Sequence, residues 1–322
     1  MANKILPRGH LERIWAPIPH LRTEEEYRTL KPGGSKFRLQ TEQLLDWEDF
    51  TQSTKHLSDP YCGNHSPFMP VIPTETFGVA NELGVQGRFV QNALHPVGEV
   101  VNFLNLGMSF GDSQWGVNRR KGNKKKKHGR DESEDEVNPK GGKRGTLIPD
   151  IVLVESQRHT IRALCEVKTH WGFQPGKNET WKTFMSQKMG QLARYMDDNY
   201  CRYGIYTVYE YTWFLKRVDD THFAVSQAIS ASTISTSSVG SLRECLLAMV
   251  IRAAHEEWSY YPVRYGKRLY VPALTSQLHR KHEMIERMTF IQSSNALFGP
   301  RQNGNNKGYI LSRTLEHQAP LI

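Results

Sequence analysis

Ile148-Pro149-Asp150-Ile151-Val152-Leu153-Val154 and Ala163-Leu164-Cys165-Glu166-Val167-Lys168 are the two stretches that decide the fold of this chain. Both are rich in apolar and β-branched residues, as buried strands are. Side chains at i and i+2 of a strand share one face, so Glu166 and Lys168 are expected side by side. The intervening turn at residues 156–159 is short and favours antiparallel pairing, which brings Asp150 to the same end of the sheet. Charges are costly to bury without partners, so this grouping indicates a functional site.

The composition places the chain in a broad class. With 322 residues, 38% of them hydrophobic, the chain is long enough for a core, and its four cysteines form no Cys-x-x-Cys pair. Free thiols are therefore expected, rather than a zinc finger or a disulfide framework. No apolar run resembles a secretion signal or a membrane span, so we expect an intracellular protein with no membrane partner.

The positive charge is concentrated in one segment. Residues 118–144 contain eleven Lys and Arg against five Asp and Glu, and so carry +6 of the net charge of +9. This segment has almost no apolar residues and is expected to be disordered. The basic run from Arg119 to Lys127 fits nuclear import or non-specific phosphate contact, and a solvated loop is the alternative. The overall charge is therefore a weak indicator of nucleic-acid binding.

The pattern of the chain predicts an α/β core over residues 76–260, between a polar extension at 1–75 and a basic tail at 261–322. Helices are expected from a start capped by Thr23 and over residues 41–50, 74–94, 181–196, 242–258 and 275–289. The first of the core helices should end at Pro96, and residues 98–106 continue as a second helix or lead into a strand. Strands are expected near 108–115 and over 146–155, 160–169, 203–217 and 221–229.

Asp150, Glu166 and Lys168 supply the parts that metal-dependent phosphodiester hydrolysis needs. Mg²⁺ prefers one or two carboxylates together with waters and phosphate oxygens. The metal lowers the pKa of a bound water and offsets the charge of the attacked phosphate. A neighbouring lysine orients the water or stabilises developing negative charge. A turn acid at Asp150 and an exposed edge pair at Glu166 and Lys168 are the ordinary alternative.

Pro149-Asp150, fifteen intervening residues and Glu166-Val167-Lys168 together resemble the PD-(D/E)XK nuclease superfamily, including its uncharacterised fungal members. The resemblance implies a restriction endonuclease-like core, a mixed sheet with helices in the order αβββαβ. It also implies that Asp150 and Glu166 bind Mg²⁺, or Mn²⁺ in its place, and that Lys168 is the catalytic lysine. The family often adds an acid from the preceding helix. Glu82 is our first choice for that ligand, and Glu99 is the alternative.

Many members of the superfamily also carry Gln-x-x-x-Tyr on the helix that follows the Glu-x-Lys strand. Gln191 and Tyr195 stand in that place, and their spacing puts them on one helix face. By resemblance Gln191 aligns a backbone phosphate, and Lys188, on the same flank as Phe184, contacts another. His170 shares the strand parity of Glu166 and Lys168 and is a candidate for the rim of the site, although a solvent-facing histidine at a strand end is the favoured interpretation. Trp171 is a candidate for stacking on a base, with packing in the core or in a loop as the alternative.

Two functions follow from the resemblance. One is a Mg²⁺-dependent nuclease-like hydrolase acting on nucleic acid, with DNA the expected substrate. The other is a catalytically inactive nuclease fold that binds nucleic acid or a protein partner. No helix-turn-helix or other reading module is recognisable, so sequence-specific recognition has no support. The sequence indicates neither the form of the substrate nor the oligomeric state.

Overall fold

The computed structural model describes residues 4–29, 38–63, 74–116, 149–255 and 258–260, together with the backbone of two short strands beyond them. The charged insertion at 118–144, its basic run and the helix expected at 275–289 lie outside these residues. The chain divides into two compact units after Tyr260. In the second unit, β9 (Val263–Arg264) pairs antiparallel with β10 (Lys267–Arg268). Among the described residues, no helix is both long enough and apolar enough to cross a membrane.

The first unit is a mixed α/β structure built on one eight-stranded sheet in the order β1-β7-β6-β5-β4-β3-β2, with β8 paired to β6. The strands β2, β3 and β4 form an antiparallel meander, β5 is parallel to β4, and β5, β6 and β7 are antiparallel. The strands are β1 (Leu44–Asp46), β2 (Met108–Asp112), β3 (Ile151–Glu155), β4 (Thr160–Val167), β5 (Tyr203–Thr207), β6 (Tyr211–Arg217), β7 (Phe223–Val225) and β8 (Ile229–Ser230).

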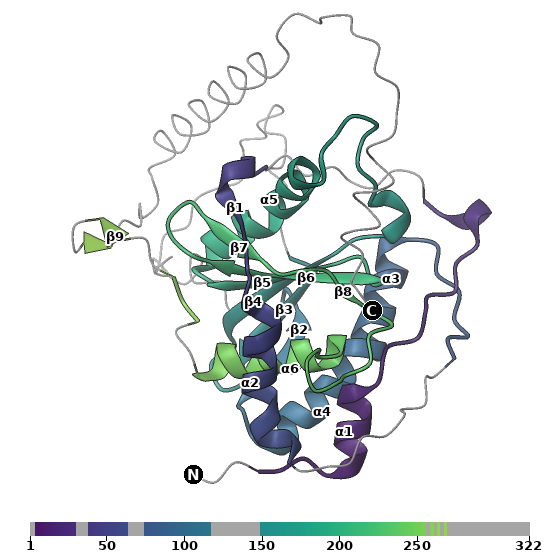
Figure 1. The fold of residues 1–322 in the computed structure, drawn as a ribbon, viewed down its shortest axis with the longest axis vertical. Helices are drawn as coiled ribbons and strands as arrows, with labels where there is room; N and C mark the ends of the chain where they lie inside the picture. The colour runs from purple at the N-terminus through teal and green to yellow at the C-terminus, as the bar shows by residue number, and fades with distance from the viewer. Residues whose placement is uncertain are drawn as a thin grey trace, which may run out of the picture. The chain divides into compact units, whose positions relative to one another are not determined.

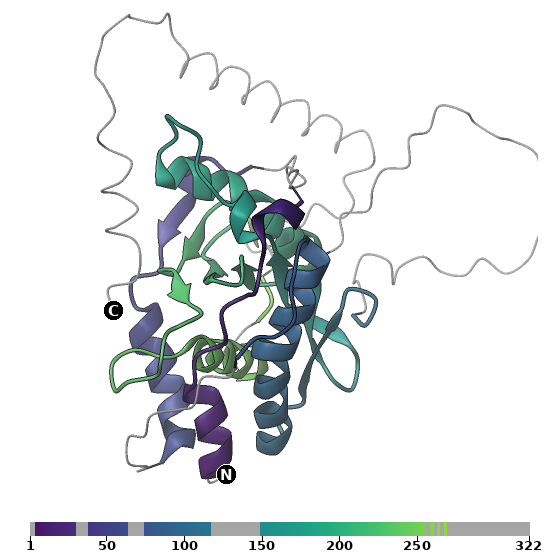
Figure 2. The ribbon, with the colours of Figure 1, turned by 90° about the vertical axis from the view of Figure 1, so that its right-hand side faces the viewer.

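Helices cover both faces of this sheet (Figure 1). One face carries α1, α2, α4 and α6, and the other carries α5, as the turned view in Figure 2 also shows. The helices are α1 (Arg8–Trp15), α2 (Phe50–Cys62), α3 (Glu82–Phe89), α4 (His95–Leu104), α5 (Trp181–Asn199) and α6 (Leu242–His255). The shorter turns are η1 (Glu25–Tyr27), η2 (Thr41–Gln43), the π-helical η3 (Val90–Leu94) and η5 (His170–Gly172).

The side chains of β4 alternate between the two faces of the sheet, so this strand contributes to the cores on both sides. Cys165 and Val167 belong to the core beneath α4 and α6, whereas Leu164 belongs to the core beneath α5. Glu166 has the parity of Leu164 and therefore faces the α5 side, because successive strand residues point to opposite faces. The buried carboxylate of Glu166 therefore lies on the face of the sheet that α5 covers.

The helix α5 makes the crossover between the parallel strands β4 and β5. Parallel neighbours need such a connection, because no tight turn can join them. Thr180 caps the helix by accepting a hydrogen bond from the backbone N–H of Thr183, and Tyr200 ends it in the left-handed conformation. The apolar side chains of Met185, Met189, Leu192 and Met196 recur at helical spacing and are buried in the core, and Trp181 is partly exposed. The helix predicted over 181–196 is confirmed, and it extends three residues further than expected, to Asn199.

The expected end of the first core helix at Pro96 is wrong. The helix begins at Glu82 rather than near residue 74, and α3, η3 and α4 follow one another without a break from Glu82 to Leu104. Pro96 follows the π-helical turn η3, and the carbonyl of Asn92, four residues before it, accepts a 2.8 Å hydrogen bond from the guanidinium of Arg243 in place of the N–H that proline lacks. Asn81 starts α3, since its side-chain oxygen accepts a 2.8 Å hydrogen bond from the N–H of Gly84.

Replacing Asn81 with alanine is expected to lower the free energy of unfolding by about 1 kcal/mol, because the first turn of α3 loses its side-chain acceptor. Asn81→Asp keeps an acceptor at the same place and should retain most of the stability. Urea denaturation of the two variants beside the wild type measures the difference. Equal losses in both variants would show that the cap does not hold the start of α3.

The region expected to be an extension at residues 1–75 supplies part of the sheet. The helix expected over 41–50 is wrong, because Leu44–Asp46 forms β1 and pairs parallel to β7. The pairing continues in a 2.8 Å hydrogen bond from the N–H of Trp47 to the carbonyl of Val225. Tertiary pairing here overrides the local helical pattern. Likewise, Thr23 caps no helix: the neighbouring η1 lacks a side-chain cap.

The strand expected over 203–217 is a hairpin rather than a single strand. The chain turns between β5 and β6 at Tyr209, which adopts a positive φ of 72°. The hydroxyl of Tyr209 donates a 2.8 Å hydrogen bond to the carbonyl of Pro19, which ties the turn to the N-terminal region. The last expected strand is also divided, into β7 and β8.

Candidate active site at the ends of β3 and β4

Asp150, just before β3, and Glu166, on β4, lie at the same end of the hairpin, as predicted. The register pairs Ile151 with Cys165, which sets Asp150 opposite Glu166 at the end of the hairpin. Asp150 Oδ2 accepts a 2.8 Å hydrogen bond from the N–H of Val167, and the amide of Gln86 on α3 donates to the Asp150 carbonyl at 3.1 Å. The backbone of this corner is therefore fixed from both the neighbouring strand and the overlying helix.

Lys168 lies between two carboxylates. Its Nζ is 2.7 Å from Glu166 Oε1 and 2.9 Å from Glu82 Oε1. The side chain of Glu166 is only 1% exposed and that of Lys168 17%, whereas that of Glu82 is 38% exposed at the start of α3. The expected neighbourhood of Glu166 and Lys168 on one strand face is confirmed.

Of the two acids weighed for the preceding helix, only Glu82 lies at this site. Glu99 lies on α4, where it forms an ion pair with Arg13 and approaches His95 at 3.7 Å. The choice follows from the helix geometry: Glu82 occupies the first turn of α3, next to the strand end, and Glu99 lies more than four turns further along.

The electrostatics of the site are dominated by burial and by an excess of acids. Burial raises the pKa of Glu166 to about 8, with Asp150 and Glu82 adding to the rise and Lys168 opposing it. Burial also raises the pKa of Asp150. Lys168 loses hydration too, yet the adjoining carboxylates raise its pKa, so it stays charged. Three carboxyl groups face one ammonium, and the site therefore retains a proton or accepts a further cation.

One carboxylate oxygen of Glu166 lacks a hydrogen-bond partner within the part of the chain that the structure describes. Glu166 Oε2 is buried and has no hydrogen bond to any group in the described part of the chain. An unpaired buried carboxylate oxygen is destabilising unless it is protonated or bound by a ligand. This oxygen is the position at which a metal ion or a proton would relieve the imbalance of charge.

Gln191 and Tyr195 lie together on α5, as the i, i+4 spacing predicts. The Gln191 amide donates a 2.7 Å hydrogen bond to the Tyr195 hydroxyl. Tyr195 is 2% exposed, and burial, followed by the charge of Glu166, raises its pKa to about 12. Tyr195 belongs to the core beneath α5 that also contains Leu164, on the face of the sheet to which Glu166 points, so this pair lies on the α5 side of the acid cluster. Lys188 is half-buried, with Nζ 5.0 Å from the ring centre of the buried Phe184.

Trp171 contacts the N-terminal region and His170 packs against Trp171, and both side chains are partly exposed. The Trp171 indole donates a 3.1 Å hydrogen bond to the carbonyl of Thr29, and the guanidinium of Arg28 lies 5.6 Å from its ring centre. His170 packs edge-on against Trp171, and its buried Nδ1 has no hydrogen bond among the described residues. Packing is thus the main role of the indole in the structure.

Replacing Glu166 with glutamine is expected to change how stability depends on pH in metal-free protein. The unfolded carboxyl releases its proton near pH 4.5, whereas the folded one holds it until about pH 8. The folded state therefore binds more protons in this window, and the wild type loses stability as pH rises through it. Chemical denaturation in EDTA measures the free energy of unfolding of both proteins. Between pH 5 and 8 this free energy should rise in Glu166→Gln relative to the wild type, by on the order of 2–4 kcal/mol. A difference that stays constant with pH would contradict this assignment.

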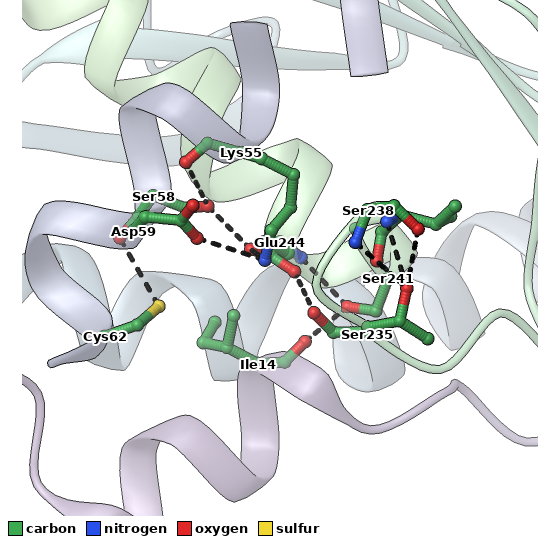
Figure 3. A network of polar contacts seen from close by, with 12 residues as sticks. Ile14, Lys55, Ser58, Asp59, Cys62, Ser235, Ser238, Ser241 and Glu244 are labelled. Atoms are coloured by element: carbon green, nitrogen blue, oxygen red, sulfur yellow. Dashed lines mark hydrogen bonds and ion pairs between the residues drawn. The ribbon is translucent and has the colours of Figure 1, made fainter. Parts of the chain in front are cut away.

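A second acidic group lies far from this site, between α2 and α6. Single ligand atoms of Asp59, Cys62 and Glu244 lie within 4.8 Å of one another. Lys55 Nζ is 2.9 Å from Glu244 and 3.1 Å from Asp59, as Figure 3 shows for the surrounding network. The ammonium already supplies the positive charge there, so the group is a buried ion pair that joins two helices.

Comparison with protein-family models, with curated proteins and with solved structures found no match to this chain. The interpretation of the site therefore depends on its own geometry. That geometry combines carboxylates suited to a hard divalent cation, an ammonium in contact with two of them, and a polar pair on the opposite helix. Sequence reasoning missed Gln86, whose contact with Asp150 spans 64 residues and leaves no local signal.

Proposed function

We propose that this chain is a Mg²⁺-dependent phosphodiesterase of the PD-(D/E)XK type, acting on nucleic acid, with DNA the expected substrate. The observation that carries the proposal is the contact of Lys168 with both Glu82 and Glu166 beside Asp150. The order of elements supports it: helix α3–α4, an antiparallel meander of three strands, α5, and then the parallel strand β5. This is the αβββαβ order that the resemblance implies for a restriction endonuclease-like core.

The residues present fit a divalent metal. Asp150 and Glu166 offer carboxylate oxygens at one corner, and Glu166 Oε2 is a buried acceptor without a partner among the described residues. Glu82 is the auxiliary ligand from α3. A bound Mg²⁺, or Mn²⁺, would lower the pKa of a bound water and offset charge on the attacked phosphate.

The side chains of the chain itself have distinct roles in this proposal. Lys168 stays protonated and positions the attacking water or the phosphate oxygens as a point charge. Asp150 is held in place by the N–H of Val167, so its orientation is set before substrate binds. The Gln191 amide, oriented by Tyr195, lies on the helix that faces the acids and is suited to align a neighbouring phosphate. Burial excludes water from Glu166 and strengthens each of these interactions.

The alternative is a nuclease fold that binds nucleic acid or a protein without cutting it. One observation favours this: Lys168 already neutralises part of the charge on Glu82 and Glu166, as a structural ion pair would. The three acids around one ammonium favour the enzyme, because a pure binding protein has no use for the excess buried charge.

A cleavage assay separates the two functions. Single-stranded, duplex and branched DNA, and RNA, are incubated with the protein and Mg²⁺ or Mn²⁺, beside Asp150→Ala. The enzyme is expected to cut at least one of them only when metal is present, and Asp150→Ala should not. Equal cleavage by both proteins would exclude the proposed mechanism, and binding without cleavage would favour the alternative.

A further inference from the structure

Tyr206, on the strand β5, lies beside the buried acid of the candidate active site. The register of the parallel strands β4 and β5 pairs Tyr206 with Glu166, and each of the two is the last residue but one of its strand. Tyr206 belongs to the core beneath α5, as Leu164 does, so its side chain lies on the face of the sheet to which Glu166 points. The tyrosine ring therefore borders the acid cluster at the carboxyl ends of these two strands.

Aromatic packing holds the ring of Tyr206 in place. Trp213 pairs with Tyr206 from β6, on the side away from β4, and the two ring centres are 6.2 Å apart. The ring of Phe173, which directly follows η5, is 5.7 Å from that of Tyr206. Tyr206 is only 1% exposed, and close packing of this kind leaves a ring little freedom. Its hydroxyl therefore keeps a fixed position relative to Glu166.

The hydroxyl of Tyr206 has no hydrogen bond to another residue in the described part of the chain, whereas those of the buried Tyr195 and Tyr209 are bonded to other groups. Burial raises the pKa of Tyr206 well above its ordinary value, and the three carboxyl groups of the site raise it further. The hydroxyl is therefore neutral and able to donate. On the neighbouring strand, Oε2 of Glu166 also lacks a partner among the described residues. Two buried polar groups without partners, side by side on one sheet face, indicate a place for a ligand.

We propose that Tyr206 is a further catalytic residue, whose hydroxyl donates a hydrogen bond to a non-bridging oxygen of the attacked phosphate. This inference rests on the proposed function. The carboxylates of the site repel the charge on the phosphate oxygens, and a fixed donor directed at those oxygens stabilises it in the transition state. A neutral hydroxyl does this without pairing with the acids, as the ammonium of Lys168 does, and it keeps its proton throughout.

Tyr206→Phe is the most direct test, because it removes only the oxygen and retains the packed ring. With Mn²⁺ and labelled nucleic acid of the form that the wild type cuts, the single-turnover rate should fall about 10²-fold. Calorimetric Mn²⁺ affinity and the free energy of unfolding in urea should not fall. Tyr211→Phe is the matched control, because Tyr211 lies on β6 in the same aromatic group, 6.3 Å from the ring of Trp213, and is exposed. It should leave the rate unchanged.

A sulfur-substituted substrate distinguishes a hydrogen bond to the phosphate from an effect of packing. Sulfur in place of one non-bridging oxygen at the cleaved phosphate is a weaker hydrogen-bond acceptor. With one of the two diastereomers, the wild type and Tyr206→Phe should differ by less than about tenfold, because the substrate has already lost most of the bond.

A wild-type cleavage rate in Tyr206→Phe would overturn this inference and leave the proposed function standing. An equal loss of rate with the oxygen substrate and with both sulfur diastereomers would also overturn it, as would a loss that parallels weaker Mn²⁺ binding. Wild-type protein that cuts no nucleic acid would overturn both this inference and the proposed function.

Discussion

Lys168→Met is expected to reduce the rate of metal-dependent cleavage by about 10²–10³-fold while leaving nucleic-acid binding almost unchanged. The loss follows from the removal of a preorganised positive group next to the reacting phosphate, which typically has an effect of this size. Binding should persist because contacts along the rest of the phosphodiester backbone do not depend on this one ammonium. Single-turnover rates and anisotropy measured on the same preparation separate the two effects.

The variant at Lys168 needs controls, because its ammonium also separates Glu82 from Glu166. Lys168→Arg retains the charge but not its position 2.7 Å from Glu166, so it should keep the fold and still lose most of the activity. Lys177→Met changes an exposed lysine in the loop before α5 and should have no effect. Full activity in Lys168→Met would show that this lysine has no catalytic role.

Glu244→Ala is expected to destabilise the fold by about 3–5 kcal/mol, because it leaves a largely buried ammonium without its buried partner and with only an exposed one. Glu244 is fully buried, and the side chain of Lys55 is 11% exposed. The same carboxylate accepts a 2.6 Å hydrogen bond from the hydroxyl of Ser58 and another from that of Ser235 (Figure 3). Its removal would therefore loosen α2, α6 and the loop between β8 and α6 together.

Chemical denaturation measures this loss, and Asp59→Asn provides the control. Asp59 also pairs with Lys55, at 3.1 Å, but its side chain is 56% exposed. An exposed partner contributes little, so the control should lose less than about 1 kcal/mol. Equal losses at Glu244 and Asp59 would contradict the view that burial makes the difference.

The candidate site was predictable because its central residues are local in sequence. Asp150, Glu166 and Lys168 lie on one hairpin, where strand alternation and a short turn suffice to bring them together. The pairing of Gln191 with Tyr195 was equally predictable, since helix periodicity puts residues i and i+4 on one face. Both of these patterns depend on contacts within one or two elements, and for such contacts the local sequence is informative.

Contacts between distant parts of the chain were not predictable. The strand β1 looks helical on its own and becomes a strand only because the edge of β7 offers it hydrogen bonds. Lys55 and Glu244 are 189 residues apart, and nothing near either residue indicates the other. Pro96 ended the helix in the prediction because a proline usually does, but the distant Arg243 donates a hydrogen bond to the Asn92 carbonyl that the missing N–H of Pro96 leaves free.

The central claim is that Asp150 and its neighbours bind a divalent cation for catalysis. Titration calorimetry with Mn²⁺ tests it most directly, on wild type, Asp150→Asn and, as a control, the exposed Asp46→Asn. We expect the wild type and Asp46→Asn to bind one ion with equal affinity, and Asp150→Asn to bind it at least about 10–100-fold more weakly. Equal Mn²⁺ affinity in Asp150→Asn and the wild type, or no binding by the wild type, would contradict the claim.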